Sequence, residues 1–596
     1  MSLLAELKRR KVLKVGAAYL VVAWVIVQVA SIVLPTFEAP VWVLRAFILL
    51  LMLGFPLALV LAWVLEVTPD GVRVETAPVG NKRMFGIAAG LTALAIVWYA
   101  FGQPALREAP AVAAAPAVAA PVAPAVPQRS IAVMPFVDMS QDKDQEYFSD
   151  GITEEILNAL TRIEGLKVAG RTSSFHFKGR NEDLKAIGAA LGVAHVLEGS
   201  VRKQGDRIRI TAQLIKVDDG FHVWSQNYDR ELDDIFAVQD EISGAIATAL
   251  KGKLAPAENA TASIDPGTYD IYLRARQQLA KRSGGSVVEA TRLFTQVIER
   301  APQFDAAWSG RAKSLGLTFN YAGGNAAEFI EPTRQSARRA LELNPGNAEA
   351  LMILAFTESL YGWNWDAAVR DMDAAIALAP NDAEVANFAG DTFRFVGDLE
   401  KAEFWERRAV ELDPLFMVNH SDLAWTLLTR RKTQEALLAS DRALRLDPTY
   451  FSVRDVRTRI FIALGDPGRA AAEVSALEKL APGYALNDEL LARVAIAAGD
   501  PVRARRHLAD MQRRAAAGET QVYAIATVQA LLGDLDDAAE SLERAHATRD
   551  PILPSDTEFL LPEEWPDHPG IRAVFAKPDL APMMANRRRF RPAAAP

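Results

Sequence analysis

The chain has 596 residues, half of them hydrophobic, and a formal net charge of −8. This length exceeds what one hydrophobic core normally supports, so several domains are expected. The acidic balance disfavours a general nucleic-acid binder, and the absence of cysteine excludes disulfides, thiolate catalysis and Cys-ligated zinc.

Three apolar stretches follow a basic tail at residues 1–14. Runs of this length and character predict transmembrane helices at 15–34, 46–65 and 85–101. Lys and Arg gather in the tail and between the second and third runs, which predicts a cytoplasmic N-terminus. Three crossings then place the C-terminal domains in the periplasm of a bacterial inner-membrane protein. Alternatively, the third run lies on the membrane or packs in protein, which returns those domains to the cytoplasm.

A Pro- and Ala-rich segment at 104–128 reads as a linker, either an extended spacer or an unstructured tether. Residues 129–252 then alternate predicted strands and helices, which indicates a compact α/β domain. We expect strands at 129–136, 166–175 and 221–228, and a hairpin turn at 204–206. Asp150 is a candidate cap for the first helix.

The second half carries a ladder of prolines that close similar phrases. Their spacing is 35 residues once and then 34 three times, and small residues recur in register between them. A fixed period of this size predicts stacked helical hairpins rather than one globular core. The ladder consists of Pro345, Pro380, Pro414, Pro448 and Pro482.

This pattern resembles the tetratricopeptide repeat (TPR), in which small residues let two helices pack closely and a proline ends the second helix. We expect about seven to eight units over residues 265–550, forming a superhelical solenoid with a concave groove, and a tail at 551–596. First helices of TPR units line that groove, so the register predicts a surface for protein or peptide partners. Its members are Asn387, Asp391, Arg394, Ser421, Trp425, Asp455 and Arg459.

A second resemblance rests on phrases of the α/β region, among them IAVMPF, QEYFSDGITEEILNAL, VLEGSVRK and RIRITAQLIKVDDGFHVWSQNYDREL. These are similar to the TolB-like N-terminal domain of bacterial membrane proteins that continue into TPR units. Members of that family often begin with a cyclase or a DNA-binding module. Only about 14 residues precede the first apolar run here, so neither activity is transferred to this chain.

The search for reactive groups finds no HExxH, P-loop, GxGxxG or GxSxG pattern. His176, His195 and His222 share the α/β region, either as a metal site or as separate strand residues. Asp142, Asp144 and Glu146 begin like a calcium loop, but the turn glycine and the final glutamate are missing. The basic end is read as a solvated tail or as a contact for an anionic surface; it comprises Arg587, Arg588, Arg589 and Arg591.

We therefore expect no catalytic residue, metal or cofactor, and no nucleic-acid partner. The leading hypothesis is a membrane-anchored scaffold or sensor that binds envelope proteins or peptides through the TPR groove, with the lipid bilayer contacted by its N-terminal helices. The alternative is a regulatory signal-transduction subunit that couples binding to a separate effector such as an adenylate cyclase. The sequence does not indicate an oligomeric state.

Overall fold

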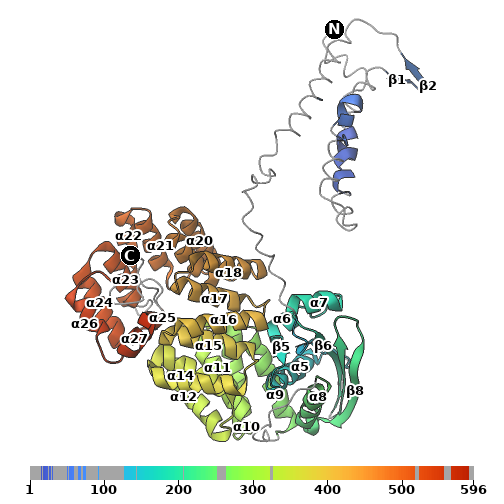
Figure 1. The fold of residues 1–596 in the computed structure, drawn as a ribbon, viewed down its shortest axis with the longest axis horizontal. Coiled ribbons are helices and arrows are strands. Elements are labelled where there is room, and N and C mark those ends of the chain that lie inside the picture. The colour runs from blue at the N-terminus through green and yellow to red at the C-terminus, as the bar shows by residue number, and fades with distance from the viewer. Residues whose placement is uncertain are drawn as a thin grey trace, which may run out of the picture. The chain divides into compact units, whose positions relative to one another are not determined.

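The protein is described from a computed structural model (Figure 1). The chain divides into two compact units, Met1–Pro124 and Ala125–Pro596. The structure describes residues 15, 18–24, 26–28, 30, 50–51, 53–58, 65–68, 71–74, 92, 126–141, 144–180, 182–205, 207–250, 264–322, 326–516, 522–555 and 565–589.

In the part Met1–Pro124, helical backbone covers described parts of 15–30 and 50–58. Tyr19 Oη donates to the Leu51 carbonyl at 2.8 Å. Strands β1 (Leu65–Thr68) and β2 (Gly71–Val74) form an antiparallel hairpin. The tail at 1–14 and nearly all of 85–101 and 104–128 lie outside the described residues.

None of the helices among the described residues combines the length and the apolar character that a bilayer crossing requires. This finding contradicts the predicted multi-pass inner-membrane localisation with periplasmic C-terminal domains. The described residues do not show the predicted contact with lipid.

The second unit begins with a mixed sheet in the order β5-β3-β6-β7-β8, in which β4 also pairs with β6. The first strands run parallel, whereas β6, β7 and β8 form a long antiparallel meander. The strands are β3 (Ser130–Val133), β4 (Val137–Asp138), β5 (Lys167–Val168), β6 (His195–Gln204), β7 (Arg207–Lys216) and β8 (His222–Glu231), and the helices are α5 (Glu146–Thr161), α6 (Arg171–Phe175), α7 (Leu184–Leu191) and α8 (Ile235–Ala249). We call residues 126–250 the α/β layer.

Apolar periodicity accounts for most of this layer. Ile152, Ile156 and Leu160 share one face of α5 and are fully buried beside alternate residues of β7, as the pattern predicts. Two predictions were wrong. The stretch 166–175 is a strand only at β5, and Arg171 then starts α6. Asp150 lies inside α5, where Lys178 Nζ donates to its carboxylate at 2.7 Å, so it caps nothing.

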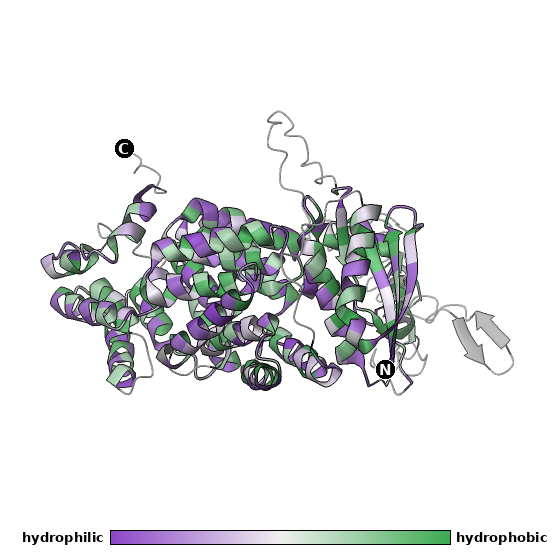
Figure 2. Cartoon of the chain, turned by 90° about the horizontal axis from the view of Figure 1, so that it is seen from below, coloured by the Kyte–Doolittle hydropathy of each residue, from purple (hydrophilic) through white to green (hydrophobic). Residues whose placement is uncertain are grey.

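Eight pairs of antiparallel helices follow in the described part of the chain, and we call them units 1 to 8 of the array. Many helices of the array show both hydrophobic and hydrophilic residues along their length, the amphipathic pattern of helices that bury one face (Figure 2). In chain order the pairs are α9 (Pro266–Ala280) and α10 (Gly284–Arg300), α11 (Asp305–Ala322) and α12 (Ala326–Leu343), α13 (Ala348–Thr357) and α14 (Trp365–Leu378), α15 (Ala383–Val396) and α16 (Leu399–Leu412), α17 (Met417–Thr429) and α18 (Thr433–Leu446), α19 (Ser452–Ala463) and α20 (Pro467–Leu480), α21 (Asn487–Ala497) and α22 (Pro501–Ala516), and α23 (Val522–Leu532) and α24 (Leu535–Ala547). A short π-helical turn, η3 (Glu358–Gly362), extends α13.

The proline ladder does what its spacing predicts. Helices α12, α14, α16, α18 and α20 each end two residues before a ladder proline. The alanines in register, Ala402, Ala409, Ala436 and Ala443, are fully buried between helices. The tandem helical hairpins predicted from the TPR-like pattern are therefore present.

The stretch after unit 8 is not a solvated tail in its described part. Helices α25 (Ile552–Ser555), α26 (Pro569–Phe575) and α27 (Ala581–Arg589) pack against units 3, 4 and 8. Trp365 Nε1 donates to the Asp579 carbonyl at 2.7 Å, and Asn586 Nδ2 donates to the Val396 carbonyl at 3.2 Å. Arg587, predicted to be solvated, is buried and donates to the Pro554 carbonyl at 2.6 Å. The array thus returns on itself at its C-terminal end.

Candidate functional site at the inner face of the array

The first helices of successive units pack on one another, from α11 and α13 through to α21 and α23. That arrangement puts them on the inner, more strongly curved side of the superhelix. We call the surface formed by these first helices the inner face. The α/β layer lies against its N-terminal part, where α5 packs on α9.

Seven alternating charges join the α/β layer to the inner face, and we call them the ionic chain. Glu154 of α5 receives Arg171 of α6 at 2.7 Å and Arg276 of α9 at 2.6 Å. Arg276 continues to Glu349 of α13 at 2.8 Å, and Glu349 receives Lys313 Nζ at 2.9 Å. In order, the members are Arg171, Glu154, Arg276, Glu349, Lys313, Glu384 and Arg282.

Burial and neighbouring charge compete at these carboxylates. Burial alone would raise the pKa of Glu154, but Arg276 and Arg171 outweigh it and hold that pKa below its usual range. Glu349 shows the same balance against Lys313 and Arg276, and its pKa also falls. Folded-state pKa values below the ordinary ones mean that these groups stabilise the fold at neutral pH and lose that contribution on acidification.

The ionic chain specifies a geometry more than it adds stability. A buried ion pair gains little over well-packed apolar groups, yet removing one partner typically costs about 3–5 kcal/mol, because a charge stays buried without its partner. Four first helices must keep their spacing for all seven groups to meet. The α/β layer and units 1 to 4 therefore hold each other in one arrangement.

A second contact joins the layer to the end of α16 and to the loop that follows it. Gly170 N–H donates to the Leu412 carbonyl at 2.7 Å, and Ser173 N–H donates to Asp413 Oδ1 at 2.7 Å. In return, Leu415 N–H donates to Ser173 Oγ at 2.8 Å. Burial raises the pKa of Asp413 to about 6, against hydrogen bonds from Ser173 that oppose the rise.

A pocket of about 100 Å³ remains between the layer and the array. Members of the ionic chain line it together with polar groups such as Asn158, Thr172 and Asn387 and the ring of Phe416. The α/β layer covers this part of the inner face, but the side chains do not fill the space between them. Its size suits a few atoms, such as a side-chain end or a small polar molecule.

The seven residues predicted to line the groove all lie on α15, α17 and α19, and the structure pairs most of them with each other or with their neighbours. Asn387 donates to Asp422 at 2.9 Å, and Arg394 pairs with Asp391. Asp455 receives Arg459 at 2.7 Å, and the guanidinium of Arg459 lies 5.5 Å from the centre of the Trp425 ring. Ser421 is fully buried.

The paired row continues into unit 7, beyond the residues that the register predicted. Arg459 reaches Glu489 of α21 at 2.6 Å, and Glu489 also pairs with Arg493 of the same helix. Arg493 Nη2 donates to Thr527 of α23 at 3.1 Å. Polar links therefore run along the inner face from unit 6 to unit 8.

An acidic group lies beside the predicted groove residues. Burial, followed by the nearby charge of Asp391, raises the pKa of Asp422 to about 7. Glu406 of α16 is fully buried, and neither carboxylate oxygen has a hydrogen-bond partner in the described structure. Burial raises the pKa of Glu406 well above its usual range, with Asp422 and Asp391 adding to the effect. This part of the inner face is electrostatically unfavourable for further negative charge.

The residues of the ionic chain were missed from the sequence. One signal was available: Glu349 and Glu384 stand at the same place in units 3 and 4, 35 residues apart, as Pro345 and Pro380 do. Nothing local indicated that Glu154, nearly two hundred residues earlier, would join them. Curvature of the array and docking of the layer bring these groups together.

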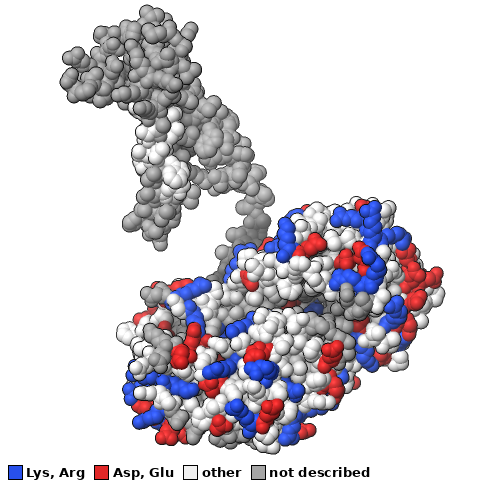
Figure 3. All heavy atoms as spheres, turned by 180° about the vertical axis from the view of Figure 1, so that it is seen from behind, with Lys and Arg blue, Asp and Glu red and all other residues white. Residues whose placement is uncertain are grey.

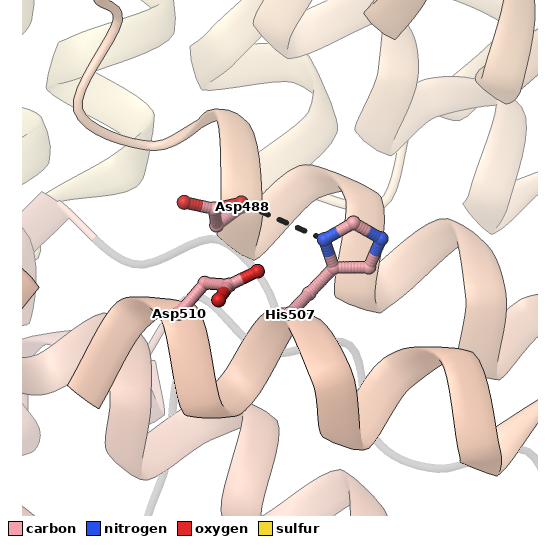
Figure 4. A group of neighbouring side chains, drawn as sticks. All are labelled: Asp488, His507 and Asp510. Carbon is pink, nitrogen blue, oxygen red and sulfur yellow. Dashed lines mark ion pairs between the residues drawn. The ribbon is translucent and has the colours of Figure 1, made fainter. Parts of the chain in front are cut away.

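The candidate ligands considered in the α/β layer lie apart. His195 of β6 contacts the Ser130 carbonyl at 3.2 Å, His176 contacts Arg180 at 3.0 Å, and His222 is exposed on β8. Of the possible calcium-loop residues, Asp142 lies outside the described residues and Glu146 pairs with Lys178 at 2.6 Å. In the described part of the chain, one group of three potential metal ligands comes together, and it lies on unit 7: Asp488, His507 and Asp510 (Figure 4).

Comparison with known proteins gives matches to parts of the chain. The family model described as "HilA/YgeH-like transcriptional regulator, second domain" matches residues 127–244. A protein of Rhizobium meliloti (strain 1021), "Putative adenylate cyclase 3", is 46% identical over 182 residues, which are 30% of this chain and 31% of that protein. The chain thus spans about a third of the length of this curated relative.

Similar solved structures include TPR proteins. A thermophilic TPR protein of Thermus thermophilus has 19% identity and a TM-score of 0.28, and covers 33% of this chain and 98% of its own. Pseudomonas aeruginosa pilF has 20% identity and a TM-score of 0.29, with 35% and 92% covered.

Proposed function

We propose that the protein is a non-enzymatic interaction scaffold whose inner face in units 4 to 7 binds an extended segment of a partner protein. The observation that carries this proposal is the ionic chain. In units 1 to 4, the inner face already holds a protein surface, the α/β layer of its own chain, through charges on successive first helices. The same kind of side chain continues on the first helices of units 4 to 7.

Paired charges suit this role because a partner can exchange with them. Arg459 contacts Asp455, Glu489 and the ring of Trp425, so an incoming carboxylate or aromatic side chain finds a cation and a ring already in position. A carboxylate displaced from Arg459 keeps a partner of its own, because Glu489 also pairs with Arg493 and Asp455 accepts from Tyr484 Oη at 2.8 Å. Lys and Arg are also interspersed with Asp and Glu over the face drawn in Figure 3.

The α/β layer supports a finer assignment. Its sequence resembles the TolB-like domain, and a regulator domain model matches most of it. We propose that the layer is a TolB-like domain whose part in this chain is to cover the inner face of the first units.

The test is selection of binding peptides from a random library on the full chain, followed by affinity measurements. We expect Trp425→Ala to weaken the selected peptides at least tenfold, and the milder Asp391→Asn to weaken them measurably. The matched control is Leu438→Ala, at a 68% exposed position of α18 on the outer side of the array. Equal binding by the inner and outer variants, or no enriched peptide, would refute the proposal.

A second candidate is a regulatory subunit for an effector such as an adenylate cyclase. The observation in its favour is the 46% identity to part of a protein named as a putative adenylate cyclase. Under this candidate, the full chain alone forms no cyclic AMP from Mg-ATP but changes the output of that cyclase at least threefold when the two are combined. An unchanged output would remove this candidate and leave the scaffold proposal standing.

A further inference from the structure

Unit 7 carries a cluster of metal-binding groups that neither the ionic chain nor the predicted groove uses. Asp488 lies in the first turn of α21, and His507 and Asp510 lie on α22 (Figure 4). The spacing of three residues puts His507 and Asp510 on one face of α22, toward Asp488. We call these three residues the unit 7 cluster.

The geometry of the unit 7 cluster fits one small cation. One ligand atom from each residue lies within 4.8 Å of the others. Around a tetrahedral ion with bonds of about 2.1 Å, ligand atoms lie ~3.4 Å apart, so rotamer adjustments of up to about 1.4 Å bring the three groups together. The side chains of His507 and Asp488 are about four-fifths buried, with exposures of 19% and 20%. The cluster is therefore sheltered and still open to entry.

The state of His507 points to a ligand rather than to a satisfied pair. Its Nδ1 is buried, and in the described structure it has no hydrogen-bond partner. The nearest carboxylate oxygen, Asp488 Oδ1, stands 3.5 Å away, which is long for a hydrogen bond. A buried ring nitrogen at this distance from a carboxylate leaves room for an ion that both could bind.

Two arginines lie beside the unit 7 cluster, and the contact of Arg514 with Asp488 does not involve Oδ1, the oxygen nearest to His507. Arg514 Nη1 contacts Asp488 Oδ2 at 3.2 Å, while Oδ1 of the same carboxylate is directed at His507. Arg513 pairs with Asp510 from the following turn of α22. Their positive charges weaken the attraction for a cation, and they also hold both carboxylates in orientation.

We propose that Asp488, His507 and Asp510 form a binding site for a divalent transition-metal ion of the zinc class, which links α21 to α22. One imidazole nitrogen with two carboxylate oxygens suits Zn²⁺ and its neighbours, whereas Ca²⁺ and Mg²⁺ prefer ligand sets made of oxygen alone. Water completes the coordination. Bound metal joins the two helices of unit 7 and stiffens the array where the polar row of the inner face passes from Glu489 to Arg493.

The experiment is titration of the purified full chain with Zn²⁺ by calorimetry, and with Co²⁺ by visible absorption. We expect one ion per chain, a higher melting temperature with Zn²⁺, and at least tenfold weaker binding in both His507→Ala and Asp510→Asn. Asp510 is the most exposed of the three, with 39% of its side chain accessible, so its variant tests the site without disturbing the packing.

The matched control is His568→Ala, because His568 stands 3.1 Å from a single carboxylate, that of Asp536. We expect its zinc affinity to equal that of the parent. Three results would overturn the proposal: no binding at millimolar Zn²⁺, equal losses in the His507 and His568 variants, or retention of full affinity by Asp510→Asn.

Discussion

The buried carboxylate of Asp413 makes the contact between the α/β layer and the array sensitive to pH. Its folded-state pKa of about 6 lies above the ordinary value of 3.8. A raised carboxyl pKa means that folding favours the protonated form, so this group stabilises the fold at low pH. That contribution is lost as the pH rises from about 4 through about 6. The difference in pKa of about 2 corresponds to about 3 kcal/mol.

Asp413→Asn removes the titrating group and keeps the shape of the side chain. Asp413 Oδ1 accepts from Ser173 N–H at 2.7 Å, and an amide nitrogen cannot accept a hydrogen bond. The substitution therefore also changes the free energy of unfolding by an amount that does not depend on pH. The useful quantity is therefore the free energy of unfolding of the variant minus that of the parent. We expect this difference to move by about 3 kcal/mol in favour of the variant between pH 4 and pH 8.

Urea denaturation at the two pH values measures this difference, and all other titrating groups cancel because both proteins share them. Asp447→Asn is the matched control, since Asp447 holds the same place one unit later but receives Thr449 N–H instead of the α/β layer. A difference for Asp413→Asn that stays constant with pH, or a gain of the same size in the control, would refute the reasoning.

Two further predictions concern the same contact. A methyl group at Gly170 would lie 2.4 Å from Asp413 Cγ, so Gly170→Ala should destabilise the protein by about 1–3 kcal/mol, seen as a lower melting temperature; Gly244→Ala, where the added atom meets open space, should not. Arg276→Met removes one cation that joins the buried Glu154 to the partly buried Glu349 and should cost about 3–5 kcal/mol by the same assay. Its control, Arg292→Met, breaks an exposed pair on α10 and should leave the melting temperature unchanged.

Much of the array could be predicted because its rules are local. Helix ends follow from Pro345, Pro414 and their equivalents, and close packing follows from small residues such as Ala402 and Ala436. For the same reason, the residues predicted to line the groove lie on first helices, α15, α17 and α19, while their contact with a partner stays a prediction. Their partners could not be predicted, because Asn387 with Asp422 and Arg459 with Glu489 join different units.

The errors arose where a local signal had a tertiary competitor. Asp150 has a side chain typical of a helix cap, but α5 starts earlier, at Glu146, and so contains Asp150. The carboxylate of Asp150 accepts a hydrogen bond from Lys178 instead. Apolar residues at 166–175 suggested a strand, yet only β5 finds a neighbour in the sheet, and the chain turns into α6, whose backbone meets Asp413. In both places contacts distant in sequence outweighed propensity.

By itself, the sequence determined the repeat length, the ends of the second helices before the ladder prolines, and the order of an α/β layer before a helical array. These depend on hydrophobic period, proline and alanine, which act within a few residues. Only the tertiary structure decided which charges meet. Arg282 reaches Glu384, 102 residues away, and Arg276 reaches Glu154, 122 residues away. These contacts depend on the curvature of the array, which is the sum of small rotations between successive units. The sequence of a single unit does not determine that sum.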